Sequence, residues 1–221
     1  MPSPEEHRAL PFAHHLVAPA LEESVANSLL DIFDSVDWTR RGCSFYRLDV
    51  PALLGDKHTI REVLGQSTQV IGRRQLFEEA YGLRLSPKPG LEIHRYSEGC
   101  GIGPHTDAEP PELRHVICLN RGWHLERGGV WILASDSKLF EGKSYLPSLS
   151  NTGFAFPTSP RSFHALSTYR GVPIYCVTLR YQIERRQAEW TEFNLTDGEW
   201  RIPGAKMKMR RPHRVGIPRG R

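Results

Sequence analysis

Apolar residues near the start of the chain recur at the spacing of a helix. They are Leu21, Val25, Leu29, Ile32, Phe33 and Val36. Because residues three and four apart fall on one face of a helix, the pattern predicts an amphipathic helix over residues 20–36. Shorter helical stretches are predicted over 58–64 and 74–81, and Gly82 marks the end of the second.

From Pro89 onward the pattern changes to short β-branched and aromatic segments. They are bounded by Gly, Pro, Asn or Ser and read LEIHRY, RHVICL, GGVWIL, GFAFP and VPIYCVTLRYQI. Such segments are typical of antiparallel strands. Helices followed by many strands predict an α+β, mainly β domain, in which N-terminal helices brace one face of a sandwich or barrel.

The last of these segments alternates between two faces. One face carries Tyr175, Val177, Leu179, Tyr181 and Ile183, and the other carries Cys176, Thr178, Arg180 and Gln182. Since successive side chains of a strand point to opposite sides, we expect the first face to meet a hydrophobic layer and the second a polar interior. Glu92, His94 and Tyr96 repeat the polar face on an earlier strand, so a barrel with a ligand cavity is predicted.

Length and charge limit the organisation. The 221 residues fit a single domain over 1–205, with a helical part over about 1–88 and a β core over about 89–185. Seven Lys and Arg residues follow position 205 without an acidic residue, while the whole chain has a net charge of only +4. We therefore expect 206–221 to be a basic, disordered tail, and nucleic acid not to be a partner.

Cysteine spacing and hydropathy indicate in which cellular compartment the protein is expected. Cys43, Cys100, Cys118 and Cys176 are scattered, without the pairs of a zinc site or the density of a disulfide scaffold. No apolar run reaches the roughly 18 residues of a membrane span, and the first residues lack the pattern of a signal peptide. We expect a cytoplasmic protein with reduced thiols and no membrane partner.

A glycine-rich segment, YSEGCGIGPHTD, ends in His105 and Asp107. A single residue separates them, and on an extended segment side chains at such positions lie on the same side of the chain. A second histidine would complete the set of two histidines and one carboxylate that binds non-haem Fe(II) and leaves positions open. His164, which follows a turn rich in Pro and Ser, is the candidate for this third ligand.

Three other histidines lie in or near predicted strands. His94 shares a face with Tyr96, so we expect it to line the cavity. His115 and His124 flank the strand that ends in Leu119-Asn120, and we expect structural roles for both.

With these motifs in this order, the chain resembles the Fe(II)- and 2-oxoglutarate-dependent oxygenases, in particular their prolyl-4-hydroxylase-like branch. The matching features, spread over about 90–183, are Tyr96, His105, Asp107, Leu119-Asn120, Gly128-Gly129, His164 and Thr178. The resemblance implies a double-stranded β-helix, or jelly roll, that uses Fe(II), 2-oxoglutarate and O2. It also implies that His105, Asp107 and His164 ligate the metal, and that Tyr96 and Thr178 belong to the 2-oxoglutarate pocket.

The resemblance fails at one functional position. The family holds the distal carboxylate of 2-oxoglutarate with Lys or Arg nine to eleven residues after the second histidine, where this chain has Pro173, Ile174 and Tyr175. A carboxylate in a partly buried pocket needs a cationic partner. Arg180, on the polar face of the last strand, is our first candidate. Arg114 is the main rival, and Arg170, on a predicted turn, is a third.

The reaction implied is hydroxylation or a related C–H oxidation such as ring closure or desaturation. Asp107 favours these over halogenation, because related halogenases have a small residue at that position. We expect a small hydrophilic metabolite as substrate, in keeping with natural-product biosynthesis. The alternatives are a peptidyl or prolyl hydroxylase, a non-catalytic metal- or ligand-binding jelly roll, and a nucleic-acid demethylase suggested by the tail alone. The polar segment 134–150 is either a lid or a strand connection.

Overall fold

The computed structural model describes residues 5–52, 54–107, 109–137 and 143–186. Its helices are α1 (Glu23–Ser35), α2 (Leu54–Gly65), α3 (Thr68–Tyr81) and the short 3-10 helix η1 (Leu125–Arg127). Its strands are β1 (Glu5–Arg8), β2 (His14–Val17), β3 (Trp38–Gly42), β4 (Tyr46–Pro51), β5 (Leu83–Leu85), β6 (Gly90–Tyr96), β7 (Gly101–His105), β8 (Glu112–Asn120), β9 (Val130–Ala134), β10 (Ser144–Pro147), β11 (Thr152–Pro157), β12 (Phe163–Leu166) and β13 (Ile174–Arg186). The predicted tail, 206–221, lies outside the described residues.

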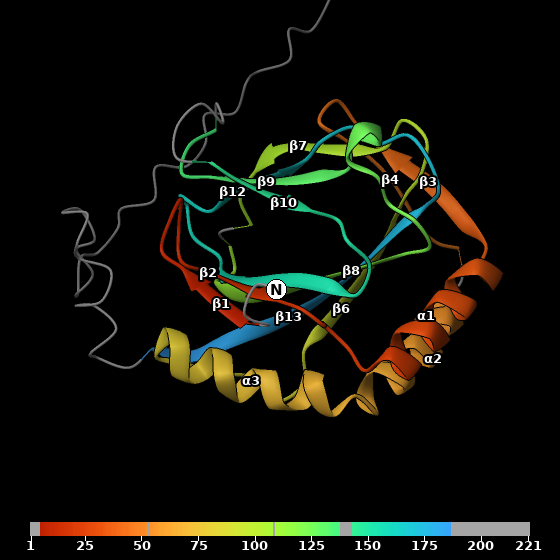
Figure 1. The fold of residues 1–221 in the computed structure, drawn as a ribbon. Helices are drawn as coiled ribbons and strands as arrows, with labels where there is room; N and C mark the ends of the chain where they lie inside the picture. Colours follow the sequence, from red (N-terminus) through yellow and green to blue (C-terminus); the bar gives the residue numbers. More distant parts are fainter. Residues whose placement is uncertain (1–4, 53, 108, 138–142, 187–221) are drawn as a thin grey trace, which may run out of the picture. The chain divides into compact units, whose positions relative to one another are not determined.

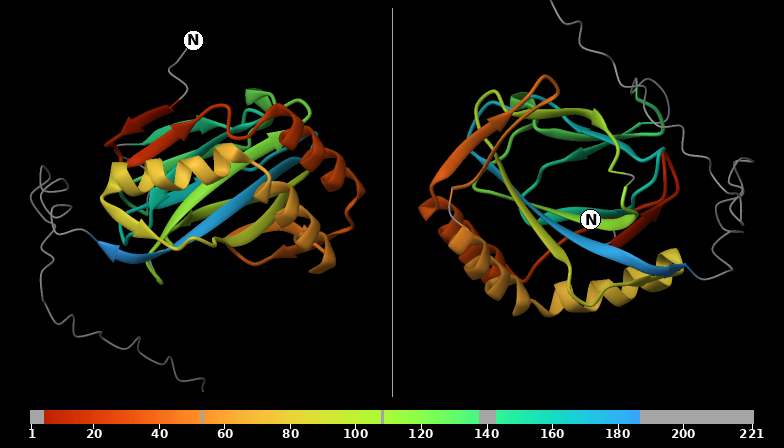
Figure 2. Two further views of the ribbon diagram at one scale, coloured as in Figure 1. Left: turned by 90° about the horizontal axis from the view of Figure 1, so that it is seen from below. Right: turned by 180° about the vertical axis from the view of Figure 1, so that it is seen from behind.

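The strands form one curled antiparallel sheet. Its order is β1-β2-β11-β8-β13-β6-β4-β7-β12-β9-β10, with β3 paired to β4 and β5 paired to β13. The sheet curls into two facing layers, one containing β2, β8, β13 and β6 and the other β7, β12, β9 and β10, as Figure 1 and the rear view in Figure 2 show. This arrangement is the double-stranded β-helix that the resemblance implies.

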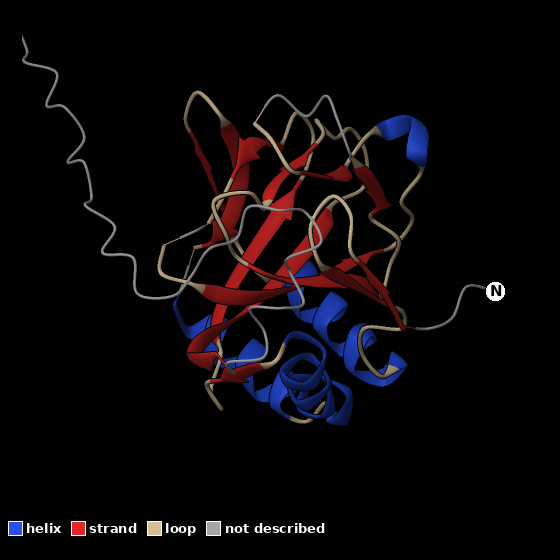
Figure 3. Cartoon of the chain, turned by 90° about the vertical axis from the view of Figure 1, so that its left-hand side faces the viewer, coloured by secondary structure: helices blue, strands red, loops and turns tan. Residues whose placement is uncertain are grey.

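The three long helices lie together on the outer face of the larger layer (Figures 1 and 3). On α1, Leu29 and Phe33 are buried, and Phe33 stacks on Tyr175 of β13 with ring centroids 5.0 Å apart. Val177 and Leu179 of the same strand face are also buried. The expected hydrophobic side of β13 is therefore confirmed. Among the described residues, no helix has the length and apolar character needed to span a bilayer.

The predicted helices are present, but their boundaries and surroundings differ from expectation. The helix expected at 74–81 begins at Thr68, where the Ser67 hydroxyl accepts a hydrogen bond from the Val70 amide (3.2 Å). It ends as expected at Gly82, whose φ of 59° is left-handed. The helical description of 1–88 needs correction, because β1 to β5 also lie there. These strands are too short for their alternation to be recognised beside the longer helical patterns.

The polar segment after β9 is at least partly a strand connection. Its second half forms β10, which pairs with β9 antiparallel, and residues 138–142 between them are outside the described residues. At the other end of β9, Gly128 has a φ of 76°, and a Cβ there would lie 2.0 Å from the Thr168 carbonyl oxygen. The two glycines of this motif therefore form a turn that only glycine fits at its first position.

The interior between the layers is mainly apolar and contains three of the four cysteines. The core cluster consists of Leu48, Tyr96, Cys100, Val116, Cys118, Trp131, Leu133, Leu146, Phe154, Phe156, Leu166, Tyr169, Ile174 and Cys176. Cys118 and Cys176 face each other across β8 and β13, with their sulfur atoms 3.9 Å apart. All four cysteines are free thiols.

A buried histidine couples the sheet to α3. His115 of β8 is fully buried, packs edge-on against Phe77 of α3 and has no hydrogen-bond partner for either ring nitrogen among the described residues. Burial, helped by the charge of Arg73, lowers its pKa to about 3. The neutral ring of His115 therefore fills space between the sheet and α3, which is a structural role of the kind we expected.

Acidification should weaken the fold through His115. A histidine whose pKa is lowered in the folded state contributes stability that is complete above its unfolded pKa and is lost as the pH falls below it. Between about pH 7 and about pH 5 the loss for one such histidine is about 2 kcal/mol. We expect His115→Leu to reduce the pH dependence of the free energy of urea unfolding by that amount. His58→Leu, at a largely exposed histidine, is the control, and equal pH dependence in both variants would contradict the assignment.

Candidate metal and co-substrate site

A cavity of about 350 Å³ opens between the two sheet layers. It is lined by Arg41, Phe45, Tyr46, Leu48, Val50, Glu92, His94, Tyr96, Ile102, His105, Asp107, Arg114, Val116, Trp131, His164, Cys176 and Thr178. All three predicted metal ligands are in this set, together with both residues that the resemblance assigns to the 2-oxoglutarate pocket.

Strand pairing brings the two histidines together. His105 ends β7 and His164 lies in β12, and the antiparallel register places them directly opposite each other. Their ring centroids are 4.1 Å apart. Since side chains of directly paired residues point to the same side of a sheet, both rings face the cavity.

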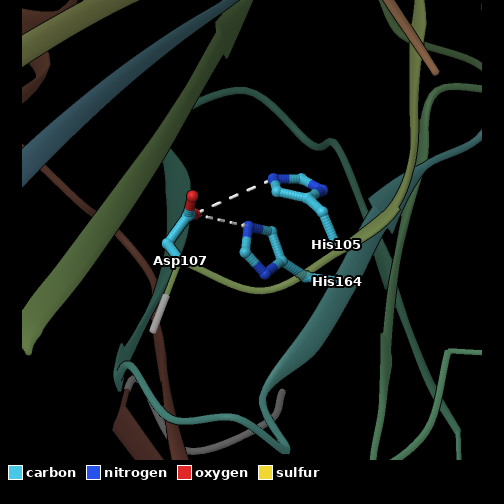
Figure 4. Close-up of side chains that lie close together, drawn as sticks. All are labelled: His105, Asp107 and His164. Carbon is cyan, nitrogen blue, oxygen red and sulfur yellow. Dashed lines mark ion pairs between the residues drawn. The ribbon is translucent and has the colours of Figure 1, made fainter. Parts of the chain in front are cut away.

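Asp107 completes the group from the segment just after β7. Its Oδ2 lies 3.8 Å from Nε2 of His105 and 3.2 Å from Nε2 of His164. The three ligand atoms all lie within 4.8 Å of one another, and Figure 4 shows the three side chains facing a common point. The three residues that the sequence predicts as metal ligands therefore lie together and form a candidate metal site.

The hydrogen bonds behind the site suit metal binding. Nδ1 of His105 is 2.9 Å from the Gly103 carbonyl oxygen, and Nδ1 of His164 is 3.2 Å from that of Ser162. A proton on Nδ1 leaves Nε2 as the free ligand atom, which is the usual arrangement behind a bound metal. Oδ2 of Asp107 is buried and accepts no hydrogen bond of ordinary geometry among the described residues. A divalent cation would satisfy this oxygen, so the residues present fit a metal ion.

Charge states also suit a metal. Burial, together with the neighbouring His164, lowers the pKa of His105, which keeps the ring in the neutral form that ligates metals. Burial alone would raise the pKa of Asp107, but the close approach of the His164 ring and the charge of Arg114 outweigh it and lower this pKa to about 2. At neutral pH the site therefore offers a carboxylate and an uncharged imidazole.

The glycines before the metal motif permit close backbone contacts. The Gly103 amide donates a hydrogen bond to the Phe45 carbonyl oxygen over 2.6 Å, and a Cβ at Gly103 would lie 3.0 Å from that oxygen. A Cβ at Gly101 would come equally close to the Leu166 carbonyl oxygen. Glycine therefore lets β7 fit tightly between the β3–β4 hairpin and β12.

Arg114 is a mostly buried cation in the cavity wall. Its side chain is 14% exposed, and its Nη1 lies 3.2 Å from Asp107 Oδ2 and 3.2 Å from Glu92 Oε2. Its Nη2 is 3.8 Å from Glu112 Oε2, and its Nε is buried with no hydrogen-bond partner among the described residues. Arg114 thus carries an unused donor next to the candidate metal site.

Arg180 is placed differently from our expectation. Alternation does put it on the same strand face as Thr178, but its guanidinium does not line the cavity. It forms a two-pronged pair with Glu112 (2.8 and 2.6 Å) and bonds Glu92 at 2.7 Å. Two acidic residues therefore occupy the donors that we expected to face 2-oxoglutarate.

The other candidates divide into cavity and surface residues. Tyr96 and His94 line the cavity as expected, and burial raises the pKa of Tyr96, so its hydroxyl remains a hydrogen-bond donor. Trp131 is 5% exposed and belongs to both the core and the cavity wall. His124 and Arg170 are exposed and lie outside the cavity lining.

Sequence reasoning missed two parts of the site. Glu112 is 4% exposed and joins Arg114 to Arg180, but its position at the start of a strand gave no signal. Arg41 and Phe45 line the cavity from the β3–β4 hairpin, which was not predicted. The alternation of Tyr46, Leu48 and Val50 was the available signal for that hairpin.

Comparison with known proteins gives structural likeness without sequence likeness. No protein-family model matches the chain, and no curated protein sequence matches it. Solved structures do match. An oxidoreductase of the 2OG-Fe(II) oxygenase family from Burkholderia pseudomallei is 16% identical, with a TM-score of 0.57 over 79% of this chain and 89% of that one.

Two further structures show a similar likeness. SnoN, a non-haem α-ketoglutarate-dependent epimerase from nogalamycin biosynthesis, is 14% identical with a TM-score of 0.57, over 87% of this chain and 91% of its own. A prolyl hydroxylase from Trichoplax adhaerens, solved with a peptide of hypoxia inducible factor, is 14% identical with a TM-score of 0.56, over 77% and 84%. The chain therefore has the double-stranded β-helix fold of the 2-oxoglutarate- and Fe(II)-dependent oxygenases.

Proposed function

We propose that this protein is a Fe(II)- and 2-oxoglutarate-dependent oxygenase that oxidises a C–H bond of a small molecule. The observation that carries the proposal is the convergence of His105, Asp107 and His164 on one point of the cavity wall. Two imidazoles and one carboxylate on one side of a metal leave its other positions open for substrates. The fold shared with 2-oxoglutarate-dependent enzymes supports the same reaction class.

The metal would be held by Nε2 of both histidines and by the Asp107 carboxylate. When bound, Fe(II) together with 2-oxoglutarate and O2 supplies an oxidant strong enough to take hydrogen from a C–H bond, while 2-oxoglutarate is converted to succinate and CO2. The protein's part is to fix these ligands, orient both substrates and keep water away. Tyr96, Trp131 and Leu48, all buried, form the apolar inner wall that excludes water.

Arg114 is our preferred anchor for a carboxylate of 2-oxoglutarate. It lines the cavity, it is mostly buried and its Nε has no partner among the described residues. A buried donor without a partner is costly, and a carboxylate would remove that cost. Arg180 is the weaker candidate because Glu112 and Glu92 accept hydrogen bonds from all three of its guanidinium nitrogens and it does not line the cavity, whereas Nε of Arg114 is left over. Tyr96 and Thr178, on strands that flank the same cavity, are candidates for further contacts.

The size of the cavity supports a small substrate. A volume of about 350 Å³ lies at the lower end of the range for small-molecule sites. The likeness to an enzyme of nogalamycin biosynthesis agrees with natural-product chemistry, whereas the likeness to a prolyl hydroxylase agrees with a peptide. We prefer the small molecule because the cavity must also hold 2-oxoglutarate.

Metal binding tests the ligand set directly. We expect the purified protein to bind Mn(II), as a stable substitute for Fe(II), and His105→Ala or His164→Ala to weaken this binding by more than about a hundredfold. Loss of an outer hydrogen-bond partner of a metal ligand already costs about ten- to hundredfold. Calorimetry gives the affinity, and His124→Ala is the control at an exposed histidine. Unchanged affinity in a ligand variant that retains its fold would contradict the assignment.

Turnover tests the reaction class. With Fe(II), 2-oxoglutarate and O2, the protein should release succinate slowly even without its primary substrate, and Asp107→Ala should abolish the release. Succinate is quantified by mass spectrometry against His124→Ala as the folded control. A protein that binds metal and releases no succinate above the Asp107→Ala background would instead be a non-catalytic metal-binding jelly roll.

Affinity for 2-oxoglutarate tests the anchor. Losing a charged hydrogen-bond partner costs about 1.5 to 3 kcal/mol, so Arg114→Gln should weaken 2-oxoglutarate binding by roughly ten- to hundredfold. Arg180→Gln should have a smaller effect, and Arg84→Gln, at an exposed arginine, should have none. Dissociation constants are measured with Mn(II) bound, after the metal affinity of each variant is known. A loss confined to Arg180→Gln would transfer the anchor to that residue.

A further inference from the structure

The cavity has two chemically different walls. Strands β6, β8 and β13 contribute the polar residues Glu92, His94, Arg114 and Thr178, which we call the polar wall, and also Tyr96, Val116 and Cys176 of the core cluster. Strands β4 and β7 contribute Tyr46, Leu48, Val50 and Ile102, which make the other wall apolar. A molecule that fills the apolar side must itself be largely apolar there, whatever the polar wall binds.

The charged groups of the polar wall compensate one another. Arg114 lies within 3.2 Å of both Glu92 and Asp107, and Arg180 also bonds Glu92 at 2.7 Å. The fourth charged residue of the lining is Arg41. Among the described residues it has no hydrogen bond and no ion pair. Arg41 is thus the cavity cation whose charge is left uncompensated.

The register of the β3–β4 hairpin turns Arg41 toward the cavity. In the β3–β4 hairpin Arg41 is directly paired with Leu48, whose side chain belongs to the core cluster and the apolar wall. Paired residues share a face, so Arg41 stands beside that wall. Its neighbour Arg40 points the other way and bonds Asp49 and Ser97. The two adjacent arginines therefore differ: one is used by the fold and the other is available to a ligand.

Phe45 adds an exposed apolar surface at the same place. Its side chain is 51% exposed, although its backbone is fixed by the hydrogen bond from the Gly103 amide. Its ring centroid lies 6.1 Å from that of His105. An exposed phenylalanine on a fixed backbone beside a metal ligand gives an apolar group of a substrate a surface to pack on.

We propose that Arg41 and Phe45 bind the primary substrate, and that this substrate is a small carboxylic acid with an apolar body. The proposal rests on the proposed function, and it revises the substrate class expected from the sequence from hydrophilic to amphipathic. The carboxylate pairs with Arg41 at the rim. The apolar body lies along Phe45 and the apolar wall, which directs it toward the metal ligands and leaves the polar wall for 2-oxoglutarate.

Fragment binding tests the proposal without turnover. The probes are 3-phenylpropionate and its uncharged amide, titrated up to about 20 mM into the full-length protein without metal or 2-oxoglutarate and followed by ligand-observed NMR. We expect the acid to bind more tightly than the amide, and Arg41→Gln to weaken binding of the acid by about fivefold, the scale of a partly exposed ion pair. Arg47→Gln is the matched control, because this exposed arginine on the same hairpin does not line the cavity.

The outcomes separate the proposal from the oxygenase assignment. Equal affinity for acid and amide, equal loss in the Arg41 and Arg47 variants, or no binding of the acid would overturn it. A loss of 2-oxoglutarate affinity in Arg41→Gln, with binding of the acid unchanged, would also overturn it by assigning Arg41 to the co-substrate. None of these results depends on succinate release, which is the test of the proposed function. Phe45→Ala should weaken both probes alike, since it removes packing and leaves the charge in place.

Discussion

The pairing of β7 with β12 determines whether the candidate metal site exists. It sets His105 directly opposite His164, although the two residues are distant in the sequence. A slip of one residue would turn one ring to the far side of the sheet layer. Gly101 and Gly103 support this register, because a Cβ at either would lie only 3.0 Å from a backbone oxygen of a neighbouring segment. The glycines of the motif therefore help to position the candidate metal ligands, even though they contribute no ligand atom themselves.

Charge compensation is the second constraint, and it extends from the metal ligands to the end of the polar wall. Buried charges are tolerated only when they are paired. Arg114 forms ion pairs with Asp107, Glu92 and Glu112. Arg180 forms ion pairs with the same two glutamates. Positive and negative side chains alternate along this network, which explains the position of Arg180 beside both glutamates. Without Arg180, two mostly buried carboxylates would share Arg114 as their single cationic partner. The position of Arg180 serves the network that orients Arg114.

The sequence predicts features that depend on local spacing and strand alternation, and it does not predict which partner a long side chain reaches. The grouping of the candidate metal ligands was predictable because the spacing of His105 and Asp107 is local, and a long alternating strand fixed the frame for His164. The destination of Arg180 was not predictable, since alternation gives the face of a strand but not the partner that a long side chain reaches. The β3–β4 hairpin was missed because β3 reads WTRRG and is largely exposed, so the alternation of β4 had no recognisable partner strand beside it.

The β3–β4 hairpin supplies part of the cavity wall, whereas the candidate metal ligands come from other segments of the chain. Strand β4 pairs with β6 of one layer and with β7 of the other, so the hairpin closes one side of the cavity. The candidate metal ligands come from β7, β12 and the segment after β7, whereas the apolar wall and Arg41 come largely from residues 41–50. The hairpin therefore shapes one side of the cavity without containing any of the candidate metal ligands. An epimerase and a prolyl hydroxylase share this fold at 14% identity to the chain, so the fold alone does not determine what the cavity accepts.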